Sequence, residues 1–421
     1  MNINLWVESS IATDRVLSNF LNDISSETVC TTRTISDISW KTLHSSLNIF
    51  SRAAHPNISW IPAYLKRNNI SYIYYLDDNF WRIQGNSELA KFYQSKSTID
   101  TLDEFVRHAS LIIVNSPSIL EFIATRFPEA QCELLPPPFD SELADKHIQP
   151  KKRASSNFVV GYAGSYKATE LEIIEKSVLD LCSKRPDIRF EFIGGITERL
   201  RGLNNVQWFP GFDDYHEFIK FKISRQWDLG LAPLLDSPFN ASKTNNKFRE
   251  YGGCGIVGLY SNVSPYRESV IHRETGYLTN NDVASWTNAI VAAAENPAQR
   301  LKISAVAKGF VKKNYSHQAI APLWMKALKK APPARPELGL STTQRMRLNY
   351  IKFHHQTHSP SLALQAETAN QLILYKRRLY ELFRYIFTIT KAKKLSIILL
   401  GLLAALTLIN LNIYLVREIL S

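Results

Sequence analysis

The chain has 421 residues, of which 45% are hydrophobic and 21% are charged, and its formal net charge at pH 7 is +12. This length and composition are sufficient for two medium-sized folded domains and exclude a wholly disordered chain. Most of the positive excess lies between Arg335 and Lys394, a stretch with 11 Lys/Arg and three Glu, so we expect no nucleic-acid-binding face on the main body.

The four cysteines are far apart in the sequence: Cys30, Cys132, Cys182 and Cys254. They form no CxxC pair, so the sequence predicts no zinc site and indicates a reducing compartment. The first residues, MNINLWVESSIATDR, lack the basic start and the long apolar core of a secretory signal, and we expect none.

Two series of apolar runs alternate with helix-like stretches. The predicted strands are INLWV (3–7), SYIYYL (71–76), ASLIIVNS (109–116), CELLP (132–136), FVVGYAGS (158–165), RFEFIGG (189–195), VQWFPG (206–211), WDLGLAPL (227–234) and GIVGLYS (255–261). Alternation of this kind is typical of parallel sheets with helices on both faces. The stretch 136–157 is Pro-rich and then basic, and it separates the two series. We therefore predict an α/β protein with two Rossmann-like domains, 1–150 and 151–330, that face each other across a cleft.

Polar residues follow two predicted strands of the first domain, at strand ends where α/β proteins bind ligands. Asp77, Asp78 and Trp81 follow SYIYYL and are expected to face the cleft. If the cleft transfers a group between two ligands, these residues would lie on the side of the ligand that receives the group, the acceptor side. A carboxylate there can act as a base on an acceptor hydroxyl or position it; equally, Asp78 can cap the next helix. Asn115 and Ser116 end another strand and are expected to line the same side.

In the second domain, the turn GYAGSYKATE leads from a strand into a helix. Its backbone N–H groups, with Gly164, Ser165 and nearby Lys167, can cradle a phosphate at the helix N-terminus. A plain strand-to-helix turn explains these residues equally well. Further on, Trp208 and Phe209 end a strand and can form a wall for a flat base, although core packing is the alternative for each.

The stretch FNASKTNNKFREYGGCG places two lysines and a glutamate at helical spacing. Lys243, Lys247 and Glu250 stand at i, i+4 and i+7, so a helix here predicts one face for all three. At a strand's carboxyl end, the two amines can neutralise a departing diphosphate, and Glu250 can accept hydrogen bonds from ribose hydroxyls. Tyr251 is placed in the same donor-binding group. The alternative is an ordinary solvated helix face.

The C-terminal part predicts a linker, a basic helical tail and a membrane span. APPARPELG (331–339) reads as a linker, and the basic amphipathic tail continues to residue 394. Residues 395–416 contain no Asp, Glu, Lys or Arg, and as a helix they would extend roughly 33 Å, enough to cross a bilayer. Basic residues precede this span, so we expect a single C-terminal anchor with the globular part on the cytoplasmic side, as in a bacterial inner membrane. A seven-residue spacing within 372–389 leaves a homodimer open.

Several of these segments together resemble a known family. In order, GYAGSYKATELEII, WDLGLAPLLDSPFNASKTNNKFREYGGCGIVGLYS and SPYRESVIHRETGYLT are similar to the donor-binding half of GT-B glycosyltransferases of the large "group 1" family. The first half is similar to a variant with an Asp-Asp-x-x-Trp element after a strand. The resemblance covers roughly residues 45–328.

The resemblance implies transfer of a sugar from a nucleotide sugar, usually with retention of configuration and without a bound metal or other cofactor. Members carry two glutamates spaced E-x7-E, and Glu250 matches the second, which binds ribose. The first falls on Ser242, and Ser165 stands where many members have an arginine; Lys243 and Lys247 can replace the missing positive charge.

The leading hypothesis is a membrane-anchored glycosyltransferase that acts on a glycan or lipid-linked acceptor at the cytoplasmic face, in polysaccharide biosynthesis. Its partners would be the nucleotide-sugar donor, the acceptor and the membrane, with no nucleic acid. Two alternatives stay open. Because the first glutamate is missing, the chain can instead be an inactive GT-B-like module that tethers a partner. The third hypothesis is a nucleotide-sugar epimerase, which has no evident need for an anchor.

Overall fold

The computed structural model describes residues 1–9, 11–44, 46–149 and 157–331, and all of these belong to one compact unit. The predicted linker and tail (331–394) and the predicted transmembrane helix (395–416) lie outside the described residues, apart from Ala331. Among the helices within the described ranges, none is long and apolar enough to span a bilayer.

The first sheet has six parallel strands in the order β2-β1-β3-β4-β5-β6. The strands are β1 (Asn2–Val7), β2 (Val29–Thr34), β3 (Leu47–Ser51), β4 (Tyr72–Leu76), β5 (Leu111–Val114) and β6 (Cys132–Leu134). Every residue of β3, β4 and β5 is buried, and accordingly β4 and β5 read as continuous apolar runs rather than as an alternating pattern.

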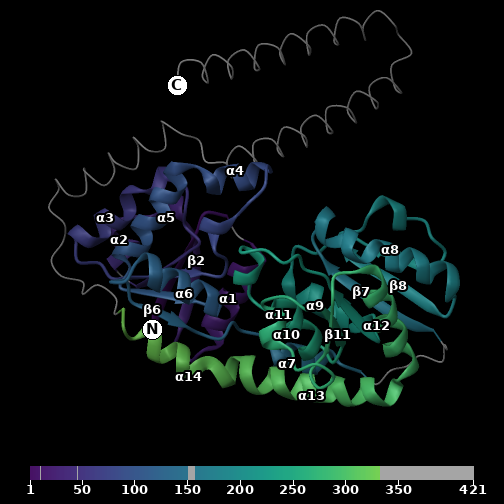
Figure 1. Cartoon of the computed structure of the whole chain (residues 1–421). Helices are drawn as coiled ribbons and strands as arrows, with labels where there is room; N and C mark the ends of the chain where they lie inside the picture. Colours follow the sequence, from purple (N-terminus) through teal and green to yellow (C-terminus); the bar gives the residue numbers. More distant parts are fainter. Residues whose placement is uncertain (10, 45, 150–156, 332–421) are drawn as a thin grey trace, which may run out of the picture. The chain divides into compact units, whose positions relative to one another are not determined.

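Helices cover both faces of this sheet (Figure 1). They are α1 (Ala12–Asp23), α2 (Trp40–His44), α3 (Trp60–Arg67), α4 (Glu88–Gln94), α5 (Lys96–His108) and α6 (Pro117–Arg126), with short 3₁₀ helices η1 (Ile35–Asp37), η2 (Pro56–Ile58) and η3 (Phe80–Arg82). One core lies between the sheet and α3, α5 and α6, and another lies between the sheet and α1. We call the sheet and these helices the first lobe.

The second sheet also has six parallel strands, in the order β12-β11-β10-β7-β8-β9. The strands are β7 (Phe158–Gly164), β8 (Ile188–Gly194), β9 (Val206–Phe209), β10 (Leu229–Ala232), β11 (Val257–Ser261) and β12 (Tyr277–Thr279). Around it lie α7 (Ser141–His147), α8 (Ala168–Lys184), α9 (Tyr215–Ser224), α10 (Asn246–Gly253), α11 (Tyr266–Ser269), α12 (Val283–Glu295) and α13 (Pro297–Tyr315), with η4 (Glu198–Leu200) and η5 (Asn240–Ser242). These elements form the second lobe.

The predicted α/β class with two parallel sheets is confirmed, and all nine predicted strands are present. Three strands were missed. β2 and β12 are edge strands, and β2 is largely exposed and polar, so neither carries the apolar run that marks a central strand. β3 is fully buried, but its five residues include an asparagine and a serine that interrupt the apolar pattern.

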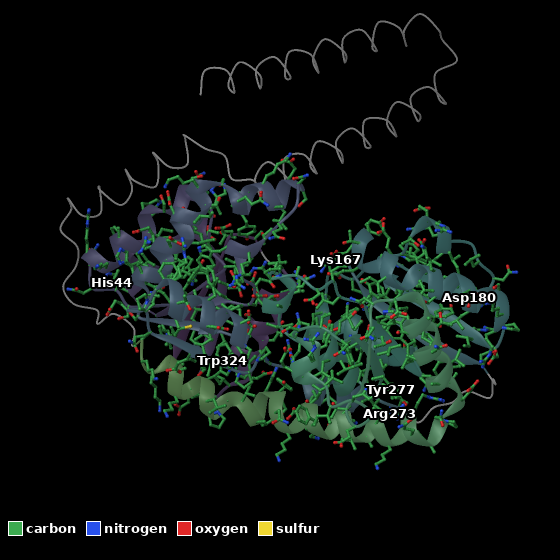
Figure 2. All side chains as sticks on the ribbon, viewed as in Figure 1. His44, Lys167, Asp180, Arg273, Tyr277 and Trp324 are labelled. Atoms are coloured by element: carbon green, nitrogen blue, oxygen red, sulfur yellow. The ribbon has the colours of Figure 1, made fainter. Side chains whose placement is uncertain are left out.

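The last described helix, α14 (His317–Leu328), packs on the first lobe although it follows the second in sequence. Ile320, Trp324 and Ala327 join the core beneath β1 and α1, and Trp324 Nε1 donates a hydrogen bond to the carbonyl of Pro136 at 2.9 Å. Figure 2 marks Trp324 on this helix, beside the first lobe. The sequence assigned residues 317–330 to the second domain, but α14 packs on the first lobe.

The segment that connects the two sheets packs on the second lobe, although it follows the first lobe directly in sequence. Phe139 and Ala144 pack into the core of the second lobe. A Cβ at Gly253 would lie 2.1 Å from the Phe139 ring, so only glycine lets α10 approach the connection this closely. The two lobes are thus linked by two segments that each pack on the lobe more distant in sequence.

Candidate functional site

The candidate donor side lies at the carboxyl ends of the strands of the second sheet. β7 and β8 end in register, with Gly164 paired to Gly194. Lys247, in the first turn of α10, donates a hydrogen bond from Nζ to the carbonyl of Ala163 in β7. A Cβ at Gly164 would lie 2.9 Å from this Nζ, so the glycine makes room for the amine. The helix therefore delivers an ammonium to the end of the central strand.

The Lys247 amine is enclosed by protein. Its Nζ lies 4.9 Å from the centre of the Tyr162 ring, and burial lowers the pKa of Lys247 to about 8. The nearby Glu250 carboxylate opposes this shift of the pKa, and the Lys167 ammonium reinforces it. Near neutral pH the site thus holds a cation with little solvation of its own, which favours an anionic ligand.

Lys243 does not lie on the helix that the sequence predicted. α10 begins at Asn246, and Lys243 follows η5 in an extended conformation with φ −68° and ψ 155°. The predicted stripe of three side chains on one helix face is therefore wrong for Lys243, and only Lys247 and Glu250 share α10. The physical reason is the break after η5, where residues 243–245 leave the helical conformation.

The Lys243 amine nevertheless lies between the lobes. Its Nζ is 3.9 Å from Asp78 Oδ1 of the first lobe and 4.5 Å from the centre of the Phe239 ring. Its side chain is 20% exposed, and burial lowers the pKa of Lys243 below its ordinary value. A donor-side amine and an acceptor-side carboxylate thus meet across the interface.

Asp77 and Asp78 follow β4 and share a guanidinium. Arg52 Nε lies 3.4 Å from Asp77 Oδ1, and Arg52 Nη2 lies 3.8 Å from Asp78 Oδ2. Thr13 Oγ1 donates a hydrogen bond to Asp77 at 3.0 Å. Burial, followed by the neighbouring Asp77 charge, raises the pKa of Asp78. Because Asn79 occupies the N-cap position of η3, the capping interpretation of Asp78 is wrong.

Sequence reasoning missed two further groups on this side. Arg52 follows the missed strand β3, and its φ of 55° is unusual for a residue other than glycine. Such backbone conformations cluster at functional sites. Asp14, in the first turn of α1, accepts a hydrogen bond from Ser51 Oγ at 2.6 Å, and burial raises its pKa to about 6. The sequence signal for these groups was the pair Ser51-Arg52 at the carboxyl end of β3, where polar residues follow a buried strand.

Three predicted acceptor-side residues have structural partners instead. Trp81 Nε1 donates to Asp103 Oδ1 at 2.8 Å, and its ring packs 5.2 Å from that of Phe122, between α5 and α6. Asn115 accepts a hydrogen bond from the Tyr75 hydroxyl and donates to the Leu135 carbonyl at 2.8 Å. Ser116 is buried at the N-cap of α6. These contacts explain the three residues through packing against their own lobe, so the expectation that Trp81 faces the cleft is corrected.

The predicted aromatic wall is divided by the alternation of β9. Trp208 is 41% exposed, donates from Nε1 to the Gly194 carbonyl at 2.7 Å, and has the Arg201 guanidinium 4.6 Å from the centre of its ring. Phe209 packs against Phe221 with ring centres 5.0 Å apart. Tyr251 is fully buried, and its hydroxyl donates to the Leu231 carbonyl at 2.8 Å. Tyr251 is therefore a core residue, and Phe209 is partly buried against the same core.

The turn after β7 adds a third amine to the site. Lys167 occupies the N-cap position of α8, and its Nζ lies 3.4 Å from Glu170 Oε1. Its charge influences the pKa values of Lys243, Lys247 and Asp78, which places all four in one electrostatic cluster. Ser165 precedes this turn and is exposed. Figure 2 shows Lys167 at the edge of the second lobe, far from Asp180 near the other end of α8.

Glu250 has one partner that the sequence did not reveal. Its Oε2 accepts a hydrogen bond from Lys222 Nζ of α9 at 2.7 Å. The carboxylate is 17% exposed and lines a cavity of about 70 Å³ between the lobes. Residues of both lobes share this lining, including Thr13, Asp77 and Arg249.

Ser242 stands where the family pattern places its first glutamate, and it is fully buried. Its Oγ donates to the carbonyl of Pro238 at 3.1 Å and lies 3.0 Å from Ser118 Oγ of α6. The position thus joins the two lobes and offers no carboxylate.

Three residues elsewhere in the described part bring possible metal ligands within 4.8 Å of one another: Asp23, Asp140 and His317. Asp140 already caps α7, and His317 Nδ1 lies 2.9 Å from Asp23 Oδ2. None of the three belongs to the lysine cluster.

No protein-family profile matches the sequence, and no curated protein matches it. Solved structures do match the fold. Sucrose-phosphate synthase from Thermosynechococcus elongatus is 16% identical, with a TM-score of 0.59 over 78% of this chain and 98% of the other. Anabaena HepE in complex with UDP is 15% identical, with a TM-score of 0.58 over 78% and 100%. The chain has the GT-B fold.

Other matches carry the same architecture. A UDP-forming trehalose-phosphate synthase from Burkholderia xenovorans is 10% identical, with a TM-score of 0.54 over 78% of this chain and 99% of the other. HepE has also been solved with UDP-glucose. At these identities the likeness establishes the fold, and the chemistry has to be argued from this chain's own residues.

Proposed function

We propose that this GT-B protein is a glycosyltransferase that moves a sugar from a nucleotide-sugar donor to a glycan or lipid-linked acceptor. The observation that carries the proposal is the cluster of three amines, Lys167, Lys243 and Lys247, at the strand ends of the second lobe, with Lys243 beside the first-lobe carboxylate Asp78. The complexes of HepE with UDP and UDP-glucose support a nucleotide sugar as the ligand class.

The amines suit a reaction in which a diphosphate leaves. As the bond from the sugar to the diphosphate breaks, negative charge grows on the leaving group, and preorganised cations stabilise that charge strongly in a site with little water. Lys243 and Lys247 are already held in place by Asp78 and the Ala163 carbonyl. Their contribution to the transition state therefore needs little reorganisation.

Asp78, next to the Lys243 amine that would face the leaving diphosphate, is the candidate for proton removal from the acceptor hydroxyl. Its raised pKa makes it a stronger base than an exposed aspartate, and Arg52 and Lys243 keep it oriented. Glu250 would hold the ribose hydroxyls. Retention of configuration and independence from metal are further parts of the proposal, taken from the family resemblance.

The location of the reaction is also proposed, at the cytoplasmic face of a membrane. It rests on the apolar run 395–416 and on the basic residues that precede it. In this account the full chain sediments with phospholipid vesicles after extraction with high salt. Recovery of the full chain in the supernatant would contradict the anchor.

The nucleotide assignment is tested with UDP, GDP, ADP and inorganic pyrophosphate. We expect at least one nucleoside diphosphate to raise the melting temperature, since a ligand that binds the folded state stabilises it. Lys243→Ala should weaken its binding by about 10- to 100-fold, the usual range for a charge-assisted hydrogen bond.

The matched control is Lys184→Ala, at the far end of α8, where the amine is 69% exposed and pairs with Asp180. This change should leave nucleotide binding unaltered. Absence of a shift with every nucleotide, or equal effects of the two substitutions, would refute the donor-site assignment.

A second candidate is a non-catalytic module that keeps the nucleotide site. Ser242 favours it, because the position of the family's first glutamate is buried and engaged with Ser118. Nucleotide binding alone does not separate the two functions. Release of nucleoside diphosphate from a nucleotide sugar by purified protein, lost in Lys247→Met, would support the enzyme; binding without turnover on any donor would support the module.

A further inference from the structure

Lys222 of α9 is the most deeply buried amine beside the candidate site. Its side chain is 0% exposed, and its Nζ lies 4.2 Å from the centre of the Phe218 ring and 5.8 Å from that of Tyr251. Lys222 Nζ donates a hydrogen bond to Glu250 Oε2 at 2.7 Å, and the two side chains form an ion pair. An ammonium in this setting loses its hydration, so it depends on that single carboxylate.

Stability alone is a poor reason for such a pair. The desolvation of two charges offsets much of their attraction, and replacing both partners with apolar side chains of similar size is often neutral or stabilising. The pair also joins two helices, α9 and α10, and Glu250 remains 17% exposed at the interlobe cavity. One oxygen of the carboxylate is thus fixed from inside the lobe while the residue reaches the cavity.

We propose that Lys222 is a positioning residue that holds the Glu250 carboxylate in the orientation needed to accept hydrogen bonds from the ribose of the nucleotide. This inference rests on the proposed function, because it assigns a role within the nucleotide site. Lys222 acts on the ribose end through Glu250, whereas Lys243 and Lys247 act on the diphosphate. Substitution of Lys222 should therefore weaken binding of ligands that contain ribose, whereas substitution of Lys243 or Lys247 should weaken binding of any diphosphate.

The experiment measures binding of UDP and of inorganic pyrophosphate to the full-length protein by calorimetry. UDP carries a ribose and pyrophosphate does not. Lys222→Met keeps the length and apolar stem of the side chain but removes the charge. We expect it to weaken UDP binding about tenfold and to leave pyrophosphate binding within twofold of wild type.

A double variant keeps the test informative about Glu250. Lys222→Met/Glu250→Ala removes both members of the ion pair and leaves neither of them unpaired, so it is expected to fold. If Lys222 works by placing Glu250, the double variant should bind UDP about as weakly as Lys222→Met. Much weaker binding by the double variant would show that Glu250 is effective without Lys222, which overturns the inference.

The matched control is Lys220→Met on the same helix, where the amine is 38% exposed and pairs with Glu217 at 2.7 Å. It should bind both ligands as wild type does. Equal losses of UDP and pyrophosphate binding in Lys222→Met would indicate a general structural defect and overturn the positioning role. Failure of the wild-type protein to bind UDP is a separate result, which would refute the UDP form of the proposed function itself.

Discussion

Lys247 keeps its ammonium inside the second lobe, where its partners are a backbone carbonyl and the face of a tyrosine ring. Burial lowers its pKa to about 8, from an ordinary value of 10.5. A bound diphosphate would supply the negative charge that the free protein lacks at this point. We therefore expect ligand binding to favour the protonated amine.

Nucleotide binding should consequently weaken as the pH rises from 7 to 9. About nine-tenths of Lys247 would be neutral at pH 9, one unit above its pKa, so the dissociation constant should rise by up to about tenfold. Lys247→Met should bind more weakly at pH 7 and change less with pH. Calorimetric titrations at pH 7, 8 and 9 measure this, and parallel pH profiles for the two proteins would contradict the assignment.

Deprotonation of Lys247 would not destabilise the folded protein, so weaker binding at pH 9 would not be caused by unfolding that starts from this residue. Because the pKa of Lys247 is lower in the folded than in the unfolded protein, the unfolded protein holds more protons between about pH 8 and 10.5. The contribution of Lys247 to stability therefore increases as the pH rises through that window.

Single residues were partly predictable from the sequence. Asp77 and Asp78 were correctly placed at the carboxyl end of a strand in the first sheet, and Lys247 was correctly placed near the strand ends of the second, because parallel strands end on a common edge of their own sheet. Asn115, Phe209 and Tyr251 are equally polar or aromatic at similar positions, yet their groups are used inside the lobes. Sequence patterns do not reveal those individual partners.

At the scale of elements, long apolar strands were predicted correctly, and the errors lie where the pattern is short or mixed. The start of α10 is the most important case, because helical spacing predicted a single stripe from Lys243 to Glu250. η5 and the extended residue Lys243 interrupt that helix. As a result, the Lys243 amine lies beside Asp78 of the first lobe instead of on the face of α10.

α14 provides the prediction at this scale. Trp324 is fully buried under the first sheet and hydrogen-bonded to the Pro136 carbonyl. Trp324→Ala should lower the free energy of unfolding by about 3–5 kcal/mol, the usual cost of truncating a large core side chain. Leu323→Ala, at a neighbouring position that is 51% exposed, is the control and should change it by at most about 0.5 kcal/mol.

Denaturant unfolding followed by circular dichroism measures both changes. A small effect of Trp324→Ala would mean that α14 contributes little to the first lobe, contrary to its place in the core.

For the described molecule as a whole, function depends on contacts between residues far apart in sequence. Lys243 meets Asp78, and Ser242 meets Ser118, from opposite lobes. The crossed packing of Phe139 and α14 ties the lobes together at two further points. None of these contacts follows from periodicity or composition, since each depends on how two separate sheets are placed against each other.

The central claim is that the amines at the mouth of the second lobe hold the diphosphate of a nucleotide sugar. A crystal structure of the protein with UDP, or with another nucleoside diphosphate that stabilises it, tests this directly. The account predicts diphosphate oxygens about 3 Å from Nζ of both Lys243 and Lys247. A nucleotide bound elsewhere, or a diphosphate that contacts neither amine, would contradict it.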